Sequence, residues 1–292
     1  MVAYRKPVND SVFGAFFIEM PQLSAPHRGI DRLLEFAPHV PPIMPFSSLG
    51  AGLFAIGALL ALGGDGTGLA ARPNPALVLW SWDRADDLRF IDARDTGVAF
   101  LAATVHVTPS GVIVTPRRNP LQLPPQTTRI AVAHIALDRD AVPGPADRAA
   151  VVDALAAIGA KYPGAALQID FEVPASQRGF LIGVVEAARR RLPDMHLSIT
   201  ALTSWCLNKT WVAQLPVDEI VPMLFRLGPD RDRIRASLVD GGDFRDPRCR
   251  ASLGVSTDEM PAALPTDRRL YAFTPQRWTA ARYAVLRRKI FR

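Results

Sequence analysis

Residues 165–174 read AALQIDFEVP, and this stretch decides how the rest of the chain is interpreted. The odd-numbered residues from Leu167 to Phe171 are apolar, whereas the even-numbered residues from Gln168 to Glu172 are polar. In a β-strand the two sets point to opposite sides of the sheet, and successive side chains on one side lie about 7 Å apart. A polar group buried without a partner costs roughly 1–3 kcal/mol, and an unpaired charge costs more. A row with two carboxylates therefore indicates a functional site, with a half-exposed antiparallel strand as the alternative.

The chain around this strand alternates between strand and helix patterns from residue 76 to its end. Such alternation predicts parallel strands joined by helical crossovers. Eight units in about 215 residues fit an α/β fold of the (β/α)8, or TIM barrel, type. An open doubly wound sheet is the alternative, disfavoured because the first strand lacks a Gly-rich turn after it. The predicted strands are residues 76–82, 98–107, 129–136, 165–172, 196–202, 218–225, 250–256 and 269–273, with a short return strand at 112–115, and the predicted helices are 84–93, 146–161, 176–191, 209–215, 230–239 and 279–291.

The first 75 residues are expected to lie outside the barrel domain, which spans 76–292. Residues 1–42 contain many prolines, so we expect them to be poorly ordered. Residues 43–75 hold a hydrophobic helix and a linker, because residues 46–64 are 19 residues without a charge. That length is close to what spans a bilayer, so this run predicts a signal or membrane anchor and an exported, periplasmic or extracellular protein. A buried core helix is the alternative.

Composition excludes several classes of function. The net charge is +6, but the basic residues are dispersed among acids and form no stripe with interleaved aromatic residues, so we expect no nucleic-acid partner. The five histidines are scattered and neither Cys206 nor Cys249 lies in a CxxC motif, so we expect no metal and no cofactor. The barrel places Cys206 after the top of one strand and Cys249 before the bottom of another. That separation argues against a disulfide, although the sequence alone does not decide the matter.

The carboxyl ends of the predicted strands carry the residues of a candidate sugar site. Asp170 and Glu172 are the candidate catalytic residues, and aromatic and polar residues at other strand ends are candidates for binding substrate. Several have structural alternatives, since a tryptophan can belong to the barrel core and a lone histidine is often satisfied there. Asp86 and Asp87 are interpreted as acids of a first helical turn, and Glu219 as structural. The predicted substrate-binding residues are Trp80, Trp82, His134, Gln168, Thr200, Trp205, Met223, Phe225, Arg226, Asp258 and Trp278.

Residues 168–174, QIDFEVP, resemble the fourth-strand signature of chitinase-type (family eighteen) glycoside hydrolases. That signature runs Asp-x-Asp-x-Glu, with an aromatic residue between the last two acids and a Pro two residues after the Glu. Asp170, Phe171, Glu172 and Pro174 match it. Residues 197–205, 217–228 and 249–259 also resemble a bacterial family of glycosidase-like barrel proteins of unknown function.

The resemblance implies that Glu172 is the general acid and that Asp170 orients an acetamido group of the substrate, which acts as the internal nucleophile. Two acids on one strand face also push their pKa values apart. Three residues depart from the pattern: Gln168 replaces the first Asp, Val173 replaces a Tyr, and Phe225 replaces a Tyr whose hydroxyl would hold the acetamide.

Two functions remain open after these departures. The first is a glycoside-hydrolase-like barrel enzyme that acts on an envelope or extracellular glycan. The second is a catalytically inactive barrel that binds a glycan or a cell-envelope polymer. A metal-dependent hydrolase is disfavoured by the scattered histidines.

Overall fold

A computed structural model describes residues 75–291 except 209–210, 229–230, 240–241 and 266. The segment expected to be poorly ordered, residues 1–42, and the hydrophobic run at 46–64 lie outside the described residues. Among the described residues, no helix is long and apolar enough to cross a membrane.

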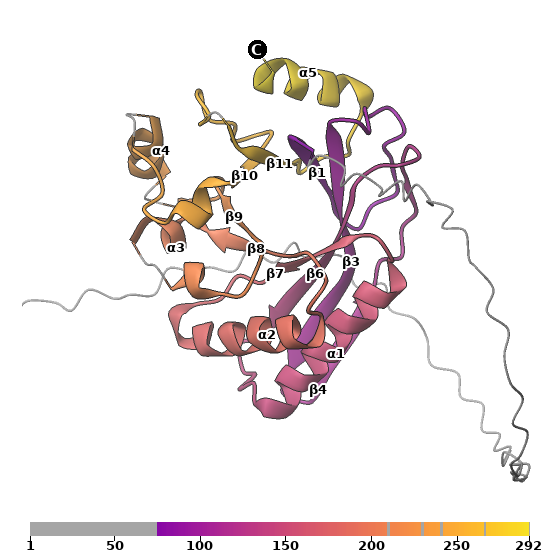
Figure 1. Ribbon diagram of the computed structural model, residues 1–292, viewed down its shortest axis with the longest axis vertical. Helices are drawn as coiled ribbons and strands as arrows, with labels where there is room; N and C mark the ends of the chain where they lie inside the picture. The colour runs from indigo at the N-terminus through magenta and orange to yellow at the C-terminus, as the bar shows by residue number, and fades with distance from the viewer. Residues whose placement is uncertain (1–74, 209–210, 229–230, 240–241, 266, 292) are drawn as a thin grey trace, which may run out of the picture. The chain divides into compact units, whose positions relative to one another are not determined.

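Eight parallel strands close into a ring, because the last strand pairs with the first (Figure 1). This arrangement confirms the predicted α/β barrel. In ring order the strands are β1 (Leu77–Ser81), β3 (Thr96–Thr108), β6 (Arg129–Leu137), β7 (Ala166–Asp170), β8 (Leu197–Leu202), β9 (Glu219–Met223), β10 (Ser252–Ser256) and β11 (Arg269–Phe273).

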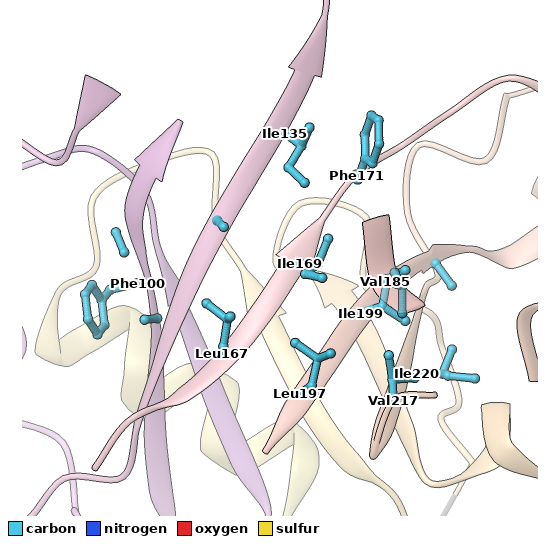
Figure 2. Packing of buried hydrophobic residues seen from close by; sticks show 14 of the residues in the cluster. Phe100, Ile135, Leu167, Ile169, Phe171, Val185, Leu197, Ile199, Val217 and Ile220 are labelled. Atoms are coloured by element: carbon cyan, nitrogen blue, oxygen red, sulfur yellow. The ribbon is translucent and has the colours of Figure 1, made fainter. Parts of the chain in front are cut away.

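Two apolar cores hold the barrel. The larger core lies between the outer side of the strands and the helices, and it includes Leu167, Ile169 and Phe171 together with Val185 of α2 (Figure 2). The smaller core fills the interior and includes Trp80. The covering helices are α1 (Pro145–Lys161), α2 (Arg178–Arg191), α3 (Thr203–Asn208), α4 (Arg231–Val239) and α5 (Ala280–Ile290), with short 3-10 turns η1 (Ala175–Gln177), η2 (Val212–Gln214) and η4 (Pro247–Arg250).

The segment after β1 differs from the prediction, because the helix expected at 84–93 does not form. Instead β2 (Asp86–Asp87) pairs in parallel with β5 (Leu121–Gln122). Asp86 is buried and accepts a hydrogen bond of 2.8 Å from the hydroxyl of Ser81. The guanidinium of Arg117 donates to three backbone carbonyls at 81–84. These contacts hold the segment extended, so the interpretation of Asp86 and Asp87 as helical first-turn acids was wrong.

Two other elements end or begin at places that the sequence did not indicate. Strand β7 stops at Asp170, so residues 171–174 continue without a strand partner. Helix α3 begins directly after β8, where a loop was expected. Within the helix predicted at 209–215, the described residues form the short turn η2, and residues 209–210 lie outside the described part of the chain.

Strand β3 rises above the barrel rim and forms a wall with β6 and β4 (Gly111–Pro116). β3 has 13 residues, and its pairing with β1 ends at Phe100. The predicted return strand β4 then takes the free edge in antiparallel register. A bulge between Leu101 and Ala103 resets the alternation. Above the bulge, the outer side chains are buried, whereas Thr104 and His106 on the inner side are half-exposed.

Cys206 and Cys249 form a disulfide, with an S–S distance of 2.08 Å and a Cα–Cα distance of 6.0 Å. The expectation that the two would lie apart was wrong. That expectation considered only the height of each cysteine along the barrel axis. The cysteines lie on two short helices that meet beside β9, because α3 packs against β8 and β9 and η4 packs against β9 and β10. Both cysteines are fully buried in the outer core.

Candidate active site

Strand register places a row of polar side chains at one level of the barrel interior. His134 of β6 lies opposite Asp170 of β7, and Thr104 of β3 lies opposite His134. Ile169 pairs with Ile199, so the next position along β8, Thr200, lies beside Asp170. Since Ile169 and Ile199 belong to the outer core, their neighbours in sequence point inward. The predicted site residues His134, Asp170 and Thr200 are thus brought together.

Asp170 is held by both of its oxygens. Its Oδ2 lies 2.8 Å from Nδ1 of His134, and its Oδ1 accepts a hydrogen bond of 2.7 Å from the hydroxyl of Thr200. An ionised carboxylate can only accept, so Nδ1 of His134 carries the hydrogen. The Asp170 side chain is only 12% exposed, against 36% for His134. Asp170 is therefore a shielded and fixed charge, while the imidazole reaches solvent.

Glu172 lies two residues beyond Asp170 and above it. Phe171 and Val173 on either side are buried in the outer core, which leaves Glu172 on the interior side of the chain. The residue is open to solvent. Its carboxylate makes no hydrogen bond or ion pair with other residues in the described part of the chain. Glu172 is consequently available to a ligand at the barrel mouth.

The surroundings of these three groups separate their pKa values. Burial alone would raise the pKa of Asp170, but the hydrogen bond and charge of His134 and the hydrogen bond of Thr200 outweigh it and lower this pKa. Burial would lower the pKa of His134, but the hydrogen bond to Asp170 and the nearby acids raise it. For Glu172, the surrounding protein and the charge of Asp170 raise the pKa, and His134 and Arg226 only partly offset them. Solvent reaches Glu172, yet its environment at the mouth favours the protonated acid.

Aromatic side chains and one arginine line the other side of the mouth. The ring of Phe225 stacks on that of Phe273, with centroids 5.8 Å apart and an interplanar angle of 11°. The guanidinium of Arg226 lies 5.7 Å from the centroid of the Phe273 ring, and the Trp82 ring meets His134 edge-on at 5.5 Å. Phe273 was not singled out from the sequence, although its place at the end of the last strand was a signal that could have found it.

No protein-family model and no curated protein matches this chain. The chain is similar to a solved structure, described as "putative Chitinase A from Streptomyces coelicolor", with 11% sequence identity and a TM-score of 0.44. The match covers 74% of this chain and 95% of that chain. The barrel rests on the strand pairing alone, and the function is argued from the side chains of the site.

Three predicted substrate-binding residues lie below the polar row, inside the barrel core. Trp80 donates from Nε1 to Oε1 of Gln168 at 2.8 Å, and Nε2 of Gln168 donates to the Ser198 hydroxyl at 3.3 Å. Gln168 and Trp80 are 0% and 4% exposed, and Met223 is 8% exposed. This layer closes the floor of the site, so Gln168 is a structural group that substrate does not reach.

Three other predicted residues are not brought to the row. Trp205 is buried in the outer core against Trp211, because α3 begins directly after β8 and carries this side chain to the outside of the barrel. Trp278 is buried and donates from Nε1 to the carbonyl of Trp80 at 2.9 Å. Asp258 is exposed, accepts a hydrogen bond from Ser256, and lines a groove of about 480 Å³ beside α5. For these residues, sequence position near a strand end did not indicate the direction of the side chain.

Glu219, at the amino-terminal end of β9, has a structural role, as predicted. Its carboxylate is bound by Arg269 at 3.0 Å, by the hydroxyl of Tyr271 at 2.7 Å and by Ser252. In the part of the chain that the structure describes, no cluster of three or more His, Cys, Asp or Glu residues could hold a metal ion.

Proposed function

We propose that this protein is a glycoside-hydrolase-like enzyme that acts on an envelope or extracellular glycan, with Glu172 as the general acid and Asp170 as its partner. One observation carries the proposal: an unpaired carboxyl group with a raised pKa lies at the barrel mouth, just above a buried carboxylate with a lowered pKa. Pairs of acids with pKa values pushed apart are how hydrolases assign the roles of acid and charged stabiliser.

The geometry supports this division of labour. Glu172 can hold its proton until a glycosidic oxygen approaches, because the charge of Asp170 disfavours a second negative charge nearby. Asp170 stays ionised through His134 and Thr200 and would stabilise the positive charge that develops on the sugar ring. The stacked rings of Phe225 and Phe273 offer an apolar surface for a sugar face.

A binding protein without turnover is the second candidate. Phe225 supports it, because this residue packs on Phe273 and brings no hydroxyl to the mouth. Gln168 supports it as well, since it is enclosed in the core and cannot replace a missing acid of the chitinase signature. A barrel of this kind would retain a glycan on its aromatic surface and release it unchanged.

Substitution of Glu172 separates the two candidates. We expect wild-type protein to release labelled products from at least one member of a panel of oligosaccharides and envelope polysaccharides. Glu172→Gln should lower this rate by at least about 100-fold, because general acid catalysis contributes typically 10²–10⁴-fold. Glu186→Gln, on the exposed face of α2, is the matched control and should retain full activity. Equal rates for Glu172→Gln and wild type would refute the proposal that Glu172 is the general acid of a hydrolase. Glycan binding measured by calorimetry, with no product released by wild type or by either variant, would support the second candidate.

We also infer that the protein is exported. The disulfide between Cys206 and Cys249 supports this inference, because such bonds form and persist in oxidising compartments outside the cytosol. Thiol labelling of the native protein, described in the Discussion, is the test.

A further inference from the structure

We propose that His134 is the second catalytic group of this site, with its Nε2 taking a proton from the attacking water while Asp170 positions the imidazole ring and takes no proton from the water. This inference rests on the proposed hydrolase function and deepens it. It also defines a substrate class, because a water nucleophile needs no 2-acetamido group on the sugar.

The hydrogen bond between His134 and Asp170 determines which nitrogen faces the substrate. Nδ1 is used by Oδ2 of Asp170 at 2.8 Å and carries the hydrogen of the neutral ring. The lone pair of that tautomer is therefore on Nε2, as in other histidines that a carboxylate orients for proton transfer. Nε2 makes no hydrogen bond with the described residues, and solvent reaches the side chain. The ring is thus fixed at one end and open at the other.

Asp170 itself is poorly suited to exchange protons or to steer an acetamido group. Both of its oxygens already accept hydrogen bonds, at 2.7 and 2.8 Å, and it is shielded from solvent. Contact with substrate would require one of these bonds to break. Phe225 also removes the hydroxyl that the chitinase-type scheme uses to hold the acetamide. These two features disfavour a substrate-assisted route and favour direct attack by water.

The backbone positions of His134 and Glu172 place the two groups on neighbouring segments at different heights. His134 is in register with Asp170 on the adjacent strand, and Glu172 is two residues further along. A strand spacing of about 4.8 Å and a two-residue rise of about 6.6 Å separate the two Cα atoms by roughly 8 Å. Inverting glycosidases hold their two carboxyl groups roughly 6.5–9.5 Å apart, so that a water molecule fits between the base and the sugar, and the proposal requires a similar separation between Nε2 of His134 and the carboxyl group of Glu172.

The reaction balances with these two groups alone. Water gives one proton to Nε2 of His134, and its oxygen forms a bond to the anomeric carbon on the face opposite the leaving group. The bond from the anomeric carbon to the glycosidic oxygen breaks, and that oxygen takes the proton of Glu172. The products are an alcohol and a sugar of inverted configuration, and proton exchange with solvent restores both residues.

The charges around His134 define its pH dependence. Asp170 faces the His134 ring from the end of β7, and Glu172 faces it from the segment that follows. Arg226 approaches Glu172 from beyond the end of β9, and a second pair, His106 with Asp138, lies on the wall of β3 and β6. His134 is a base only when neutral, and Glu172 is an acid only when protonated. The rate should therefore follow a bell-shaped pH profile, with one limb from each residue.

The test compares His134→Ala with His106→Ala in wild-type background. His106 is the matched control, since its Nε2 lies 2.7 Å from Oδ1 of Asp138 and the residue is also half-exposed. On a glycan without acetamido groups, we expect His134→Ala to lower kcat by at least about 100-fold, with little change in KM and partial rescue by added imidazole. The pH limb of His134 should vanish. His106→Ala should keep both limbs, and NMR of the wild-type product should show inversion.

The outcomes separate this inference from the hydrolase proposal. If the wild-type protein hydrolyses no glycan, both the hydrolase proposal and the role of His134 as its base are refuted. If hydrolysis is lost in the Glu172 variant but not in the His134 variant, only the role of His134 is overturned. A product of retained configuration has the same consequence. Nitrogen-15 NMR of the histidines is independent of activity: hydrogen on Nδ1 of neutral His134 is expected, and hydrogen on Nε2 would overturn the inference.

Discussion

Asp170 keeps its charge in a buried position because two different strands supply its partners. His134 comes from β6 and Thr200 from β8, so the carboxylate is satisfied only when three neighbouring strands are in register. The same contacts lower its pKa and raise that of His134. Folding and protonation are therefore linked at this pair.

The pair should make stability depend on pH in a defined window. The folded-state pKa of Asp170 lies below the ordinary 3.8, so its contribution is present above that value and is lost as pH falls through the lowered pKa. The folded-state pKa of His134 lies above the ordinary 6.5, so its contribution is complete below 6.5 and is lost as pH rises through the raised pKa. We expect the stability difference between wild type and His134→Gln to be largest between pH 3.8 and 6.5.

Urea denaturation at a series of pH values measures this difference. His106→Gln is the control, because its half-exposed ring pairs with Asp138 on the wall and makes no hydrogen bond with Asp170. The linkage between protonation and folding would be contradicted if the stability difference between wild type and His134→Gln did not vary with pH, or if it grew as pH rose above the raised pKa of His134.

The alternation of residues 167–172 was enough to predict that Asp170 and Glu172 share a face, because period-two patterning determines which side a residue occupies. It could not separate Gln168 from Asp170. The depth at which each lies depends on register with β6 and β8, and on the indole of Trp80, which reaches Gln168 across the barrel. These are non-local contacts, and a single strand carries no signal for them.

At the scale of elements, the strands were predictable and the connections were less so. Each strand carries an apolar run long enough to define it, and β11 has the predicted bounds, Arg269–Phe273. The segment at 84–93 has a plausible helical pattern, but Arg117 donates to the carbonyl of Arg84 and Ser81 donates to the carboxylate of Asp86, which holds the segment extended. Tertiary contacts that outweigh local propensity explain this error.

Packing of β10 against Trp80 leaves little free space at the floor of the site. A Cβ added at Gly254 would lie 2.9 Å from Cη2 of Trp80 and 3.4 Å from the backbone of Met223. The indole cannot easily move, since Gln168 holds its nitrogen and Tyr271 packs against its ring at 5.2 Å. Gly254→Ala should therefore destabilise the protein by about 1–3 kcal/mol, the usual effect of overpacking a core.

Thermal and urea denaturation of Gly254→Ala check this expectation. Gly179→Ala is the matched control: it lies in the first turn of α2, and an added Cβ would meet nothing within 4 Å. The control should be neutral or slightly stabilising, because alanine favours a helix over glycine. Equal stability of Gly254→Ala and wild type would mean that Trp80 is less constrained than its contacts indicate.

At the scale of the whole molecule, the weakest seam of the ring is the junction of β9 with β10. These strands share one register pair, Met223 with Gly254, together with a hydrogen bond of 2.7 Å from the nitrogen of Leu224 to the carbonyl of Gly254. The disulfide joins α3, which follows β8, to η4, which precedes β10, so it spans this seam from the outside. The sequence did not predict the bond, because the lateral approach of two short helices depends on the closed barrel.

Loss of the disulfide should loosen the barrel at this seam first. The bond encloses a sequence separation of 43 residues, and removing a crosslink of that size costs about 2–4 kcal/mol. We expect reductant to lower the denaturation midpoint of wild type but not that of a Cys206→Ala, Cys249→Ala double variant. Hydrogen exchange should rise in β9 and β10 of that variant before it rises in β3 and β6, which pair along nine positions.

Alkylation without reductant should find no free thiols in protein isolated from its native compartment, and two labelled cysteines there would contradict both the crosslink and the export proposed from it.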